Sequence, residues 1–462
     1  MNAGPATSLE QRTALLQGEV SSRELLAHAL DRAEEVGELG AFVSLNPELA
    51  LAEADECDGQ ISATPAAERH QLPPLLGLPT AHKDLVNVRG VATTHGSRAV
   101  PHSPAESDDP VVAAVRKAGA ISIGKTQVPE FGIAGYSEND VAPPARNPHN
   151  SALTAGGSTR GTAAAIASRV FPAAIGSDAG GSIRIPSGAC GLVGLKPGRG
   201  RVPADVASVI KPDPIGAPQL GVSGPMARTA DDAALWFDAL LGDPQGTSLS
   251  AVGRAGRVSG LRIGVSLDSP FESWFPVTFT DEAHAAVAAA VSRLEAHGHV
   301  VEEASIDYGQ SYPEAFTTVW TQALTRLGLA EDAQSRLGEL ATMFLEQARE
   351  KTSDEVEAAV KALGEFAHSA LRQWGSYDAI LSPALSGPPP AIGEFRARGP
   401  EGDYQLQCEW APQTSMVNVV GTPAVVCPAP GVVVEGRPVG IQLIGRMGAE
   451  VTLLQLAAQL TS

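Results

Sequence analysis

Residues 176–197 read GSDAGGSIRIPSGACGLVGLKP, in which an apolar run of strand type ends in a tight glycine turn and a serine, Ser182. The turn supplies four consecutive backbone N–H groups, those of Ala179, Gly180, Gly181 and Ser182. Without bulky side chains, such amides can converge on one point, which is what an oxyanion hole needs. A serine at the end of this turn could attack a carbonyl group that the same amides polarise.

A serine nucleophile needs a base, and no histidine of this chain lies in a comparable glycine-rich context. Lys83, in LPTAHKDLV at 78–86, can serve if it is neutral, because burial lowers the pKa of a lysine. Ser158 lies in AGGSTRGTA at 155–163. Its hydroxyl could relay the proton by accepting a hydrogen bond from Ser182 and donating one to Lys83. Each segment alone is weak evidence, because a lone lysine is usually a surface charge and Gly-Gly-Ser is usually a turn or linker.

Residues 119–126, GAISIGKT, fit the phosphate-binding pattern G-x-x-x-x-G-K-[ST]. A phosphate site requires the four intervening residues to form an open loop after a strand, with a helix following the lysine. Here those residues are strand-like, a helical pattern precedes them, and Pro129 follows soon after. We therefore expect a strand that ends in a turn, and no nucleotide site.

Helical and strand patterns alternate along most of the chain. Helical patterns cover 21–36, 109–119, 162–168, 227–242, 281–298 and 312–375. Strand patterns cover 120–124, 171–178, 260–266, 299–305, 377–385, 424–430 and 439–445. The alternation predicts an α/β fold, a single large domain over 1–462 with a mixed central β-sheet flanked by helices on both faces. We expect N-terminal helices within 1–65 to pack on this domain, and the proline-rich piece 386–393 to be an ordered loop.

The composition is typical of a globular chain, since 43% of the 462 residues are hydrophobic and 18% are charged. The net charge of −19 argues against nonspecific binding to nucleic acid or to an anionic membrane. Because neither a signal segment nor a membrane-length apolar run occurs, we expect a cytoplasmic protein. The cysteines and the ten histidines show no metal-ligand spacing. The four cysteines indicate reduced thiols packed as small hydrophobic residues: Cys57, Cys190, Cys408 and Cys427.

Taken together, these segments resemble the amidase signature family of serine hydrolases. The family's G-G-S-S-G-[GS]-[ST]-A loop corresponds to GGSTRGTA at 156–163. Its D-x-G-G-S-[IV]-R-x-P and C-G-[LV]-x-G-[LF]-K-P elements correspond to DAGGSIRIP and CGLVGLKP within 178–197. Other segments resemble the family's lysine segment, its G-K-T-N-x-P-E-F element and its later elements: 78–97, 123–132, 221–234, 419–430 and 438–445. The resemblance runs from about residue 20 to residue 460 in consistent order.

The resemblance implies a serine amidase with Ser182 as nucleophile, Ser158 as a bridging serine in a cis peptide bond, and Lys83 as base. Such an enzyme would form an acyl-enzyme on Ser182 and release a carboxylate and an amine or ammonia. The resemblance implies no metal and no organic cofactor. It implies a small-molecule amide as substrate, and homodimerisation is plausible on this ground alone.

Four neighbouring residues complete the expected site. Asp178 and Arg184 stand where the family usually orders its nucleophile loop, and Thr159 offers a hydroxyl where a second serine is usual. Arg160 departs from the family's Gly or Ser. Arg160 could contact a substrate carboxylate, but we expect it to point outward or to have a structural role.

Substrate choice and two alternative functions stay open at this point. Phe316, Trp320 and Trp410 lie outside the shared motifs, in the helical region 312–375 and in a loop, and they would favour an apolar or aryl substrate unless they are ordinary core residues. One alternative is the glutamine-hydrolysing component of a tRNA-amidotransferase-like complex, although the C-terminal region for that role is not evident. The other alternative is a catalytically silent binding protein on the same fold.

Overall fold

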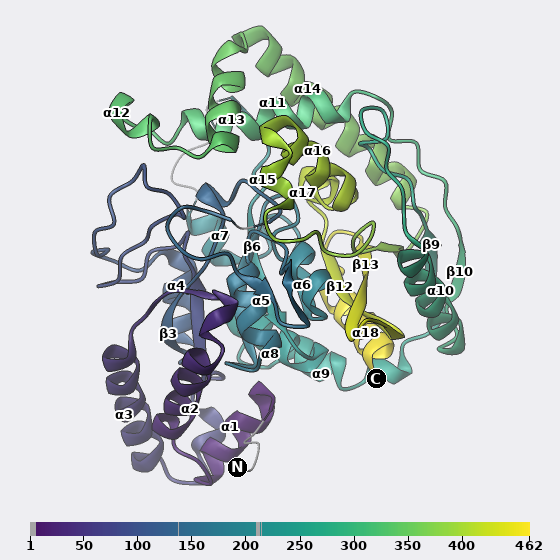
Figure 1. Cartoon of the computed structure of the whole chain (residues 1–462). Helices are drawn as coiled ribbons and strands as arrows, with labels where there is room; N and C mark the ends of the chain where they lie inside the picture. The colour runs from purple at the N-terminus through teal and green to yellow at the C-terminus, as the bar shows by residue number, and fades with distance from the viewer. Residues whose placement is uncertain (1–5, 137, 209–212, 214) are drawn as a thin grey trace.

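Eight strands form a mixed sheet at the centre of the computed structural model, which describes residues 6–136, 138–208, 213 and 215–462 (Figure 1). In spatial order they are β10 (Val300–Glu303), β9 (Arg262–Val265), β11 (Ala379–Pro383), β13 (Arg437–Gly445), β12 (Ala424–Val434), β7 (Val193–Lys196), β8 (Val222–Ala227) and β6 (Ala173–Asp178). The pairs β10–β9 and β9–β11 are parallel, and every later pair is antiparallel. The predicted mixed sheet is therefore confirmed.

A smaller three-stranded sheet continues beside β6. It has the order β1 (Phe42–Leu45), β3 (Ile121–Thr126) and β2 (Pro79–Lys83), with β2 parallel to β3 and β1 antiparallel to it. The Thr80 hydroxyl on β2 donates to the carbonyl of Ala173 on β6 at 3.4 Å. Both strands run in the same direction from this point, so the last residue of β2, Lys83, lies beside the end of β6.

Helices cover both faces of the large sheet. On one face, α5 (Arg160–Ala167) packs against α6 (Arg184–Cys190). On the other face, α18 (Glu450–Thr461) lies between α8 (Ala230–Leu241) and α10 (Asp281–Ala296). Both α6 and α18 contact β7, β12 and β13, so the two groups enclose the sheet as expected for a layered α/β domain.

Two further groups of helices lie at opposite ends of the view in Figure 1. At the lower left, α1 (Ser8–Gln17), α2 (Ser22–Glu35) and α3 (Pro47–Ala63) lie near the small sheet. Residues 1–5 of the expected N-terminal region lie outside the described residues. At the top are α11 (Tyr312–Thr325), α12 (Glu331–Gln334), α13 (Glu339–Glu350) and α14 (Ser353–Trp374), above α15 (Glu394–Ala397), α16 (Gly399–Trp410) and α17 (Ser415–Val420).

The shorter elements are α4 (Pro110–Lys117), α7 (Pro203–Ser208), α9 (Thr247–Val252), β4 (Arg146–Asn147) and β5 (Asn150–Thr154). The phosphate-loop pattern is resolved as predicted, because Gly124, Lys125 and Thr126 belong to strand β3. The expected ordered loop at 386–393 is confirmed by the amide of Thr154, which donates to the carbonyl of Pro390 at 2.9 Å.

Several sequence-based boundaries were wrong, two of them near the predicted site residues. Helix α5 begins at Arg160, two residues earlier than predicted, because the glycine-rich loop turns directly into helix. Trp410 is the last residue of α16 and does not lie in a loop. Among the described residues, no helix is long and apolar enough to cross a membrane, and no group of three or more His, Cys, Asp or Glu side chains is placed to hold a metal ion. All four cysteines are free, and Cys190, Cys408 and Cys427 are buried.

Candidate active site

Three loops or strand ends bring Lys83, Ser158 and Ser182 to one edge of the sheets. Lys83 ends β2, Ser158 precedes α5, and Ser182 lies in the loop between β6 and α6. The two serine loops are held together directly, because the amide of Thr159 donates to the carbonyl of Ser182 at 3.2 Å. Parallel β2 and β6 place the lysine beside both loops, although 75 residues separate Lys83 from Ser158.

Lys83 is buried, and its amino group contacts only uncharged oxygens. Nζ lies 2.7 Å from Ser158 Oγ, 2.9 Å from Ser177 Oγ and 3.2 Å from the carbonyl oxygen of Ser177. The side chain is 3% exposed, and this desolvation lowers the pKa of Lys83 to about 7, against a small opposing effect of the Asp178 charge. A neutral amine, the form that a base needs, is therefore accessible near neutral pH.

The loop before α5 passes very close to a neighbouring segment. The peptide bond between Gly157 and Ser158 is cis. A Cβ atom at Gly157 would lie 2.6 Å from the backbone nitrogen of Tyr136, so only glycine fits there. This close approach explains why the loop is rich in glycine, and it places the Ser158 hydroxyl against the lysine.

Ser182 forms part of the wall of a cavity next to these groups. Its hydroxyl makes no hydrogen bond within the part of the chain that the structure describes. Lys83 and Ser158 are thus in contact as the relay requires, but with the amino group as donor, and the predicted hydrogen bond between Ser158 and Ser182 is not formed. Catalytic hydrogen bonds are often long or misaligned without substrate, so this geometry remains compatible with the relay.

A buried ion pair holds the loop that carries Ser182. Two nitrogens of Arg184, Nη2 and Nε, each lie 3.0 Å from an Asp178 carboxylate oxygen. Asp178 also accepts hydrogen bonds from the amides of Gly181 and Ile183. Although burial alone would raise it, the Arg184 guanidinium holds the pKa of Asp178 well below its usual range. The carboxylate thus stays charged and ties both ends of the turn together.

The predicted set of oxyanion-hole amides needs one correction. The amide of Gly181 donates to Asp178 Oδ1 at 2.8 Å and is therefore not free to bind an oxyanion. The amides of Ala179, Gly180 and Ser182 donate no hydrogen bond to any residue that the structure describes. Three of the four predicted donors therefore remain free, whereas the amide of Gly181 helps to hold the Asp178 carboxylate in place.

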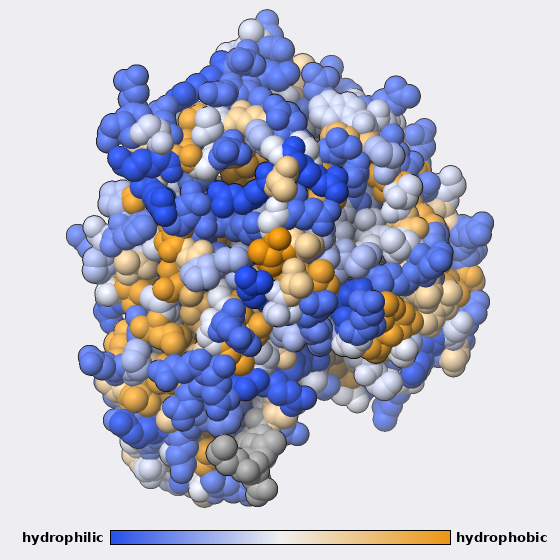
Figure 2. All heavy atoms as spheres, viewed as in Figure 1, coloured by the Kyte–Doolittle hydropathy of each residue, from blue (hydrophilic) through white to orange (hydrophobic). Residues whose placement is uncertain are grey.

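The cavity beside Ser182 is open to solvent and has mainly apolar walls. Phe316 and Trp320 come from α11, and Trp410 ends α16. All three predicted aromatic residues line the cavity, but only α11 of the region 312–375 reaches it. Figure 2 shows apolar residues, in orange, at the floor of a hollow below α13 in otherwise largely polar surroundings.

Arg160 and Thr159 have structural contacts. Arg160 is fully buried and donates to the side chains of Gln127 and Thr154, each at 3.3 Å. Of the two expected positions for Arg160, outward-pointing or structural, its burial and contacts support the structural one. The Thr159 hydroxyl donates to the carbonyl of Ser177 at 3.1 Å.

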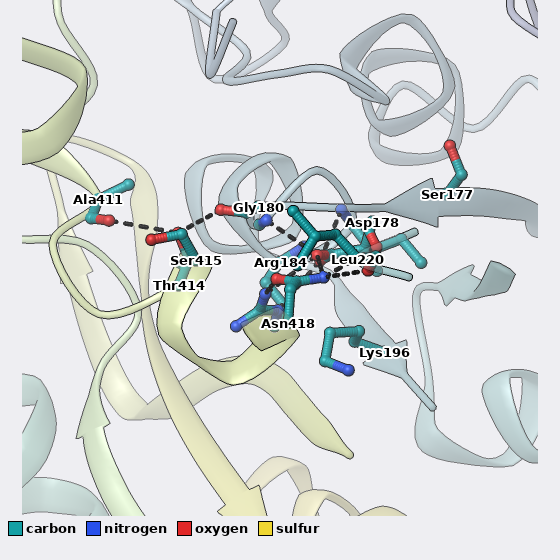
Figure 3. A network of polar contacts seen from close by, with 12 residues as sticks. Ser177, Asp178, Gly180, Arg184, Lys196, Leu220, Ala411, Thr414, Ser415 and Asn418 are labelled. Carbon is teal, nitrogen blue, oxygen red and sulfur yellow. Dashed lines mark hydrogen bonds and ion pairs between the residues drawn. The ribbon is translucent and has the colours of Figure 1, made fainter. Parts of the chain in front are cut away.

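Sequence reasoning missed three polar residues at the site: Ser177, Thr414 and Asn418. Ser177 accepts two hydrogen bonds from Lys83 and directly precedes Asp178, so its place in the motif was a usable signal. Asn418 donates to the Asp178 carbonyl and carboxylate at 2.9 Å each, and Thr414 donates to the carbonyl of Gly180 (Figure 3). No local signal could reveal these last two, because they lie more than 230 positions from their partners.

Comparisons with known proteins identify the family of this chain. The profile of the family described as Amidase matches residues 24–454. AmiB2 of Mycobacterium bovis, whose name assigns it provisionally to the amidases, is 35% identical over 468 residues, covering 99% of this chain and 96% of that protein. A solved structure of 6-aminohexanoate cyclic dimer hydrolase with its substrate has a TM-score of 0.83 and 28% identity, covering 98% of this chain and 96% of the other.

One relative bears on the alternative functions. A component of the glutamyl-tRNA(Gln) amidotransferase of Ralstonia nicotianae is 30% identical over 501 residues, covering 98% of this chain and 96% of that component. This similarity keeps such a component among the alternative functions. The family profile spans nearly the whole chain, and these relatives match over nearly their whole length, so this chain belongs to the amidase family.

Proposed function

We propose that this chain hydrolyses small, uncharged carboxylic amides with an apolar acyl group, through an acyl-enzyme on Ser182. Membership of the amidase family supports hydrolysis of an amide C–N bond. The observation that carries the finer proposal is the buried Lys83 amine at 2.7 Å from Ser158, beside a serine that opens into an uncharged cavity. The bond cleaved would be an amide of a small molecule and not a peptide bond within a protein.

Ser177 would aim the base in this mechanism. A neutral lysine has two N–H groups and one lone pair. Its two N–H groups can continue to donate to the carbonyl and hydroxyl oxygens of Ser177, which lie 3.2 and 2.9 Å from Nζ. The lone pair then faces the remaining neighbour, the hydroxyl of Ser158, and can accept its proton.

The proton relay would work in both halves of the reaction. Ser158 passes its proton to Lys83 as it takes the proton of Ser182, and Ser182 Oγ forms a bond to the amide carbon. The developing oxyanion accepts hydrogen bonds from the free amides of residues 179, 180 and 182. When the C–N bond breaks, the relay returns a proton to the leaving amine. Water, deprotonated by the same relay, then attacks the ester and releases the carboxylic acid and Ser182.

The cavity supports an apolar acyl group because no charged side chain lines it among the described residues. Apart from the Ser182 hydroxyl, the polar side chains in the following pairs are engaged with protein partners. Gln407 accepts from the amide of Gly135 and donates to Asp403, Ser415 shares a hydrogen bond with Tyr312, and the Tyr404 hydroxyl shares one with Thr317. A substrate carboxylate or ammonium group would lose its hydration here without gaining a partner.

The same cavity disfavours glutamine as the substrate. Free glutamine carries an α-carboxylate and an α-ammonium group, and both need charged or strongly polar partners when they leave water. The similarity to an amidotransferase component keeps glutamine hydrolysis as the second candidate. The uncharged lining of the cavity makes it the weaker of the two.

A panel of primary amides tests the proposal. Benzamide, hexanamide, glutamine and a ureido amide would be compared by kcat/KM, with ammonia release as the readout. We expect the two apolar amides to exceed glutamine by at least about 100-fold, the effect of burying an unpaired charge in an apolar pocket. Ser182→Ala should abolish turnover and labelling by a fluorophosphonate probe. Preferred hydrolysis of glutamine would refute the apolar assignment, and an unlabelled, inactive wild-type protein would support a silent binding protein.

A further inference from the structure

We propose that Thr414 is a positioning residue that fixes the orientation of the peptide group between Gly180 and Gly181. The inference rests on the proposed function, since this peptide group lies in the turn that would hold the oxyanion. Thr414 precedes α17 and belongs to the wall of the substrate cavity, 234 positions from Gly180 in the chain.

Both ends of this peptide group are held by side chains. The Thr414 hydroxyl donates to the carbonyl oxygen of Gly180 at 2.7 Å (Figure 3). The N–H on the other side of the same peptide bond, that of Gly181, donates to Asp178 Oδ1 at 2.8 Å. Because a peptide unit is planar, two opposed hydrogen bonds determine its rotation about the chain axis. The plane is therefore set by Thr414 at one end and Asp178 at the other.

This plane lies between two of the free oxyanion donors. The amide of Gly180 precedes it and the amide of Ser182 follows it. Gly181, at φ +128°, is in a region that only glycine adopts readily, so its rotation is not limited by a side chain. Without an external restraint, the segment that joins the two donors could shift, and the flanking N–H groups would then be held less firmly. Oxyanion stabilisation depends on donors that are already aimed before the reaction.

The contact between Thr414 and the turn is close as well as polar. A Cβ atom at Gly181 would lie 2.5 Å from Thr414 Oγ1 and 2.7 Å from Thr414 Cβ. Thr414 is itself fixed, because it is buried and its hydroxyl has a second, longer contact of 3.2 Å with the carbonyl of Ala411. The Asp178 end would remain in place without Thr414, since Arg184 and Asn418 hold the carboxylate. Loss of the Thr414 hydroxyl should therefore release one end of the plane only.

Thr414→Val removes the hydroxyl and keeps the shape of the side chain. With the best apolar amide as substrate, we expect kcat to fall by about 10- to 100-fold and KM to change by less than about threefold, because the loss concerns the transition state. The affinity for a boronic acid that carries the same apolar group, and forms a tetrahedral adduct on Ser182, should fall by about the same factor as kcat. Thr414→Ser keeps the donor and should retain kcat within about threefold.

Thr422→Val is the matched control. Thr422 is also a buried threonine, and its hydroxyl has no hydrogen-bond partner within the described part of the chain. This variant should have the kcat and boronic acid affinity of the wild-type protein. An unchanged kcat in Thr414→Val would overturn the inference, as would equal losses in the two valine variants or a Thr414→Ser variant as impaired as Thr414→Val.

The outcome also separates this inference from the proposed function. A wild-type protein that hydrolyses apolar amides, together with a fully active Thr414→Val variant, removes only the role of Thr414. A wild-type protein that neither hydrolyses amides nor reacts with a fluorophosphonate at Ser182 removes both.

Discussion

The pH dependence of amide hydrolysis gives the sharpest test of Lys83 as the base. The active form is the neutral amine, so activity should be lost as pH falls through the pKa of Lys83. Burial lowers that pKa from 10.5 to about 7. With this value, kcat/KM should fall roughly 50-fold between pH 7 and pH 5 and gain only about twofold above pH 7. A lysine of ordinary pKa would instead give a rate that rises about tenfold per pH unit up to about pH 9 and levels off only above about pH 10.

The assay is the initial rate of ammonia release from a neutral apolar amide between pH 5 and pH 10, at low substrate concentration. The substrate does not titrate in this range, so the acid limb of the kcat/KM profile reports the pKa of a group in the free enzyme. Lys196 provides a control, because it is also buried and its pKa is also lowered to about 7, but its Nζ donates to the carbonyl of Pro197 and is not bonded to Ser158. Lys196→Met should leave the midpoint of the acid limb within about half a pH unit, whereas Lys83→Met should remove activity.

Three results would refute this reasoning. A rate that is flat from pH 5 to pH 8 would show that no base of this pKa takes part. A rate that continues to climb through pH 9 would show that burial does not lower the pKa of Lys83 as the structure implies. If the midpoint of the acid limb of the pH–rate profile shifts in Lys196→Met, while circular dichroism shows that this variant keeps its fold, then Lys83 is the wrong lysine.

Two further predictions concern neighbouring residues. Ser158→Ala should lower kcat by a factor of about 10² to 10⁴, the usual contribution of a proton-transfer group. Ser177→Ala should lower kcat only roughly tenfold, because Ser177 aims Lys83 without carrying a proton. Stopped assays on both variants would contradict this prediction if Ser177→Ala were the more impaired. Arg160→Ala should lower the free energy of unfolding by roughly 2–4 kcal/mol, measured by urea denaturation, because it removes a buried side chain and its hydrogen bonds to Gln127. The same variant should keep the wild-type preference for neutral over acidic amides, and a changed preference would restore Arg160 as a substrate-binding residue.

Much of the fold could be predicted from local sequence. The segment 171–178 is apolar and followed by glycines, so a strand ending in a turn is its natural conformation, and β6 ends at Asp178. The helical pattern at 21–36 begins with Ser21 and Glu24, which form a capping box at the start of α2. Such features depend on residues a few positions apart, so a single sequence reveals them.

Other features depended on contacts that no local pattern encodes. Arg160 carries a charge and sits next to a flexible-looking glycine loop, which favours an exposed position by sequence alone. In the folded chain it is fully buried at the start of α5, and its guanidinium donates to the side chains of Gln127 and Thr154. The segment around Trp410 has no strong helical periodicity, which favours a loop, yet α16 extends to Trp410 and its ring packs near Phe395.

The candidate site divides in the same way. The order and chemistry of Lys83, Ser158 and Ser182 were readable from three short motifs, because each motif is local. Their catalytic states were not readable, because the lowered pKa of Lys83 comes from burial between two sheets and two loops. The sequence likewise indicated four consecutive backbone amides as donors to an oxyanion. Only the tertiary structure decided that Gly181 points to Asp178 and that Thr414, more than 230 residues further on, holds the same peptide plane, since hydrogen bonds of this range exist only after the sheet and its helices have packed together.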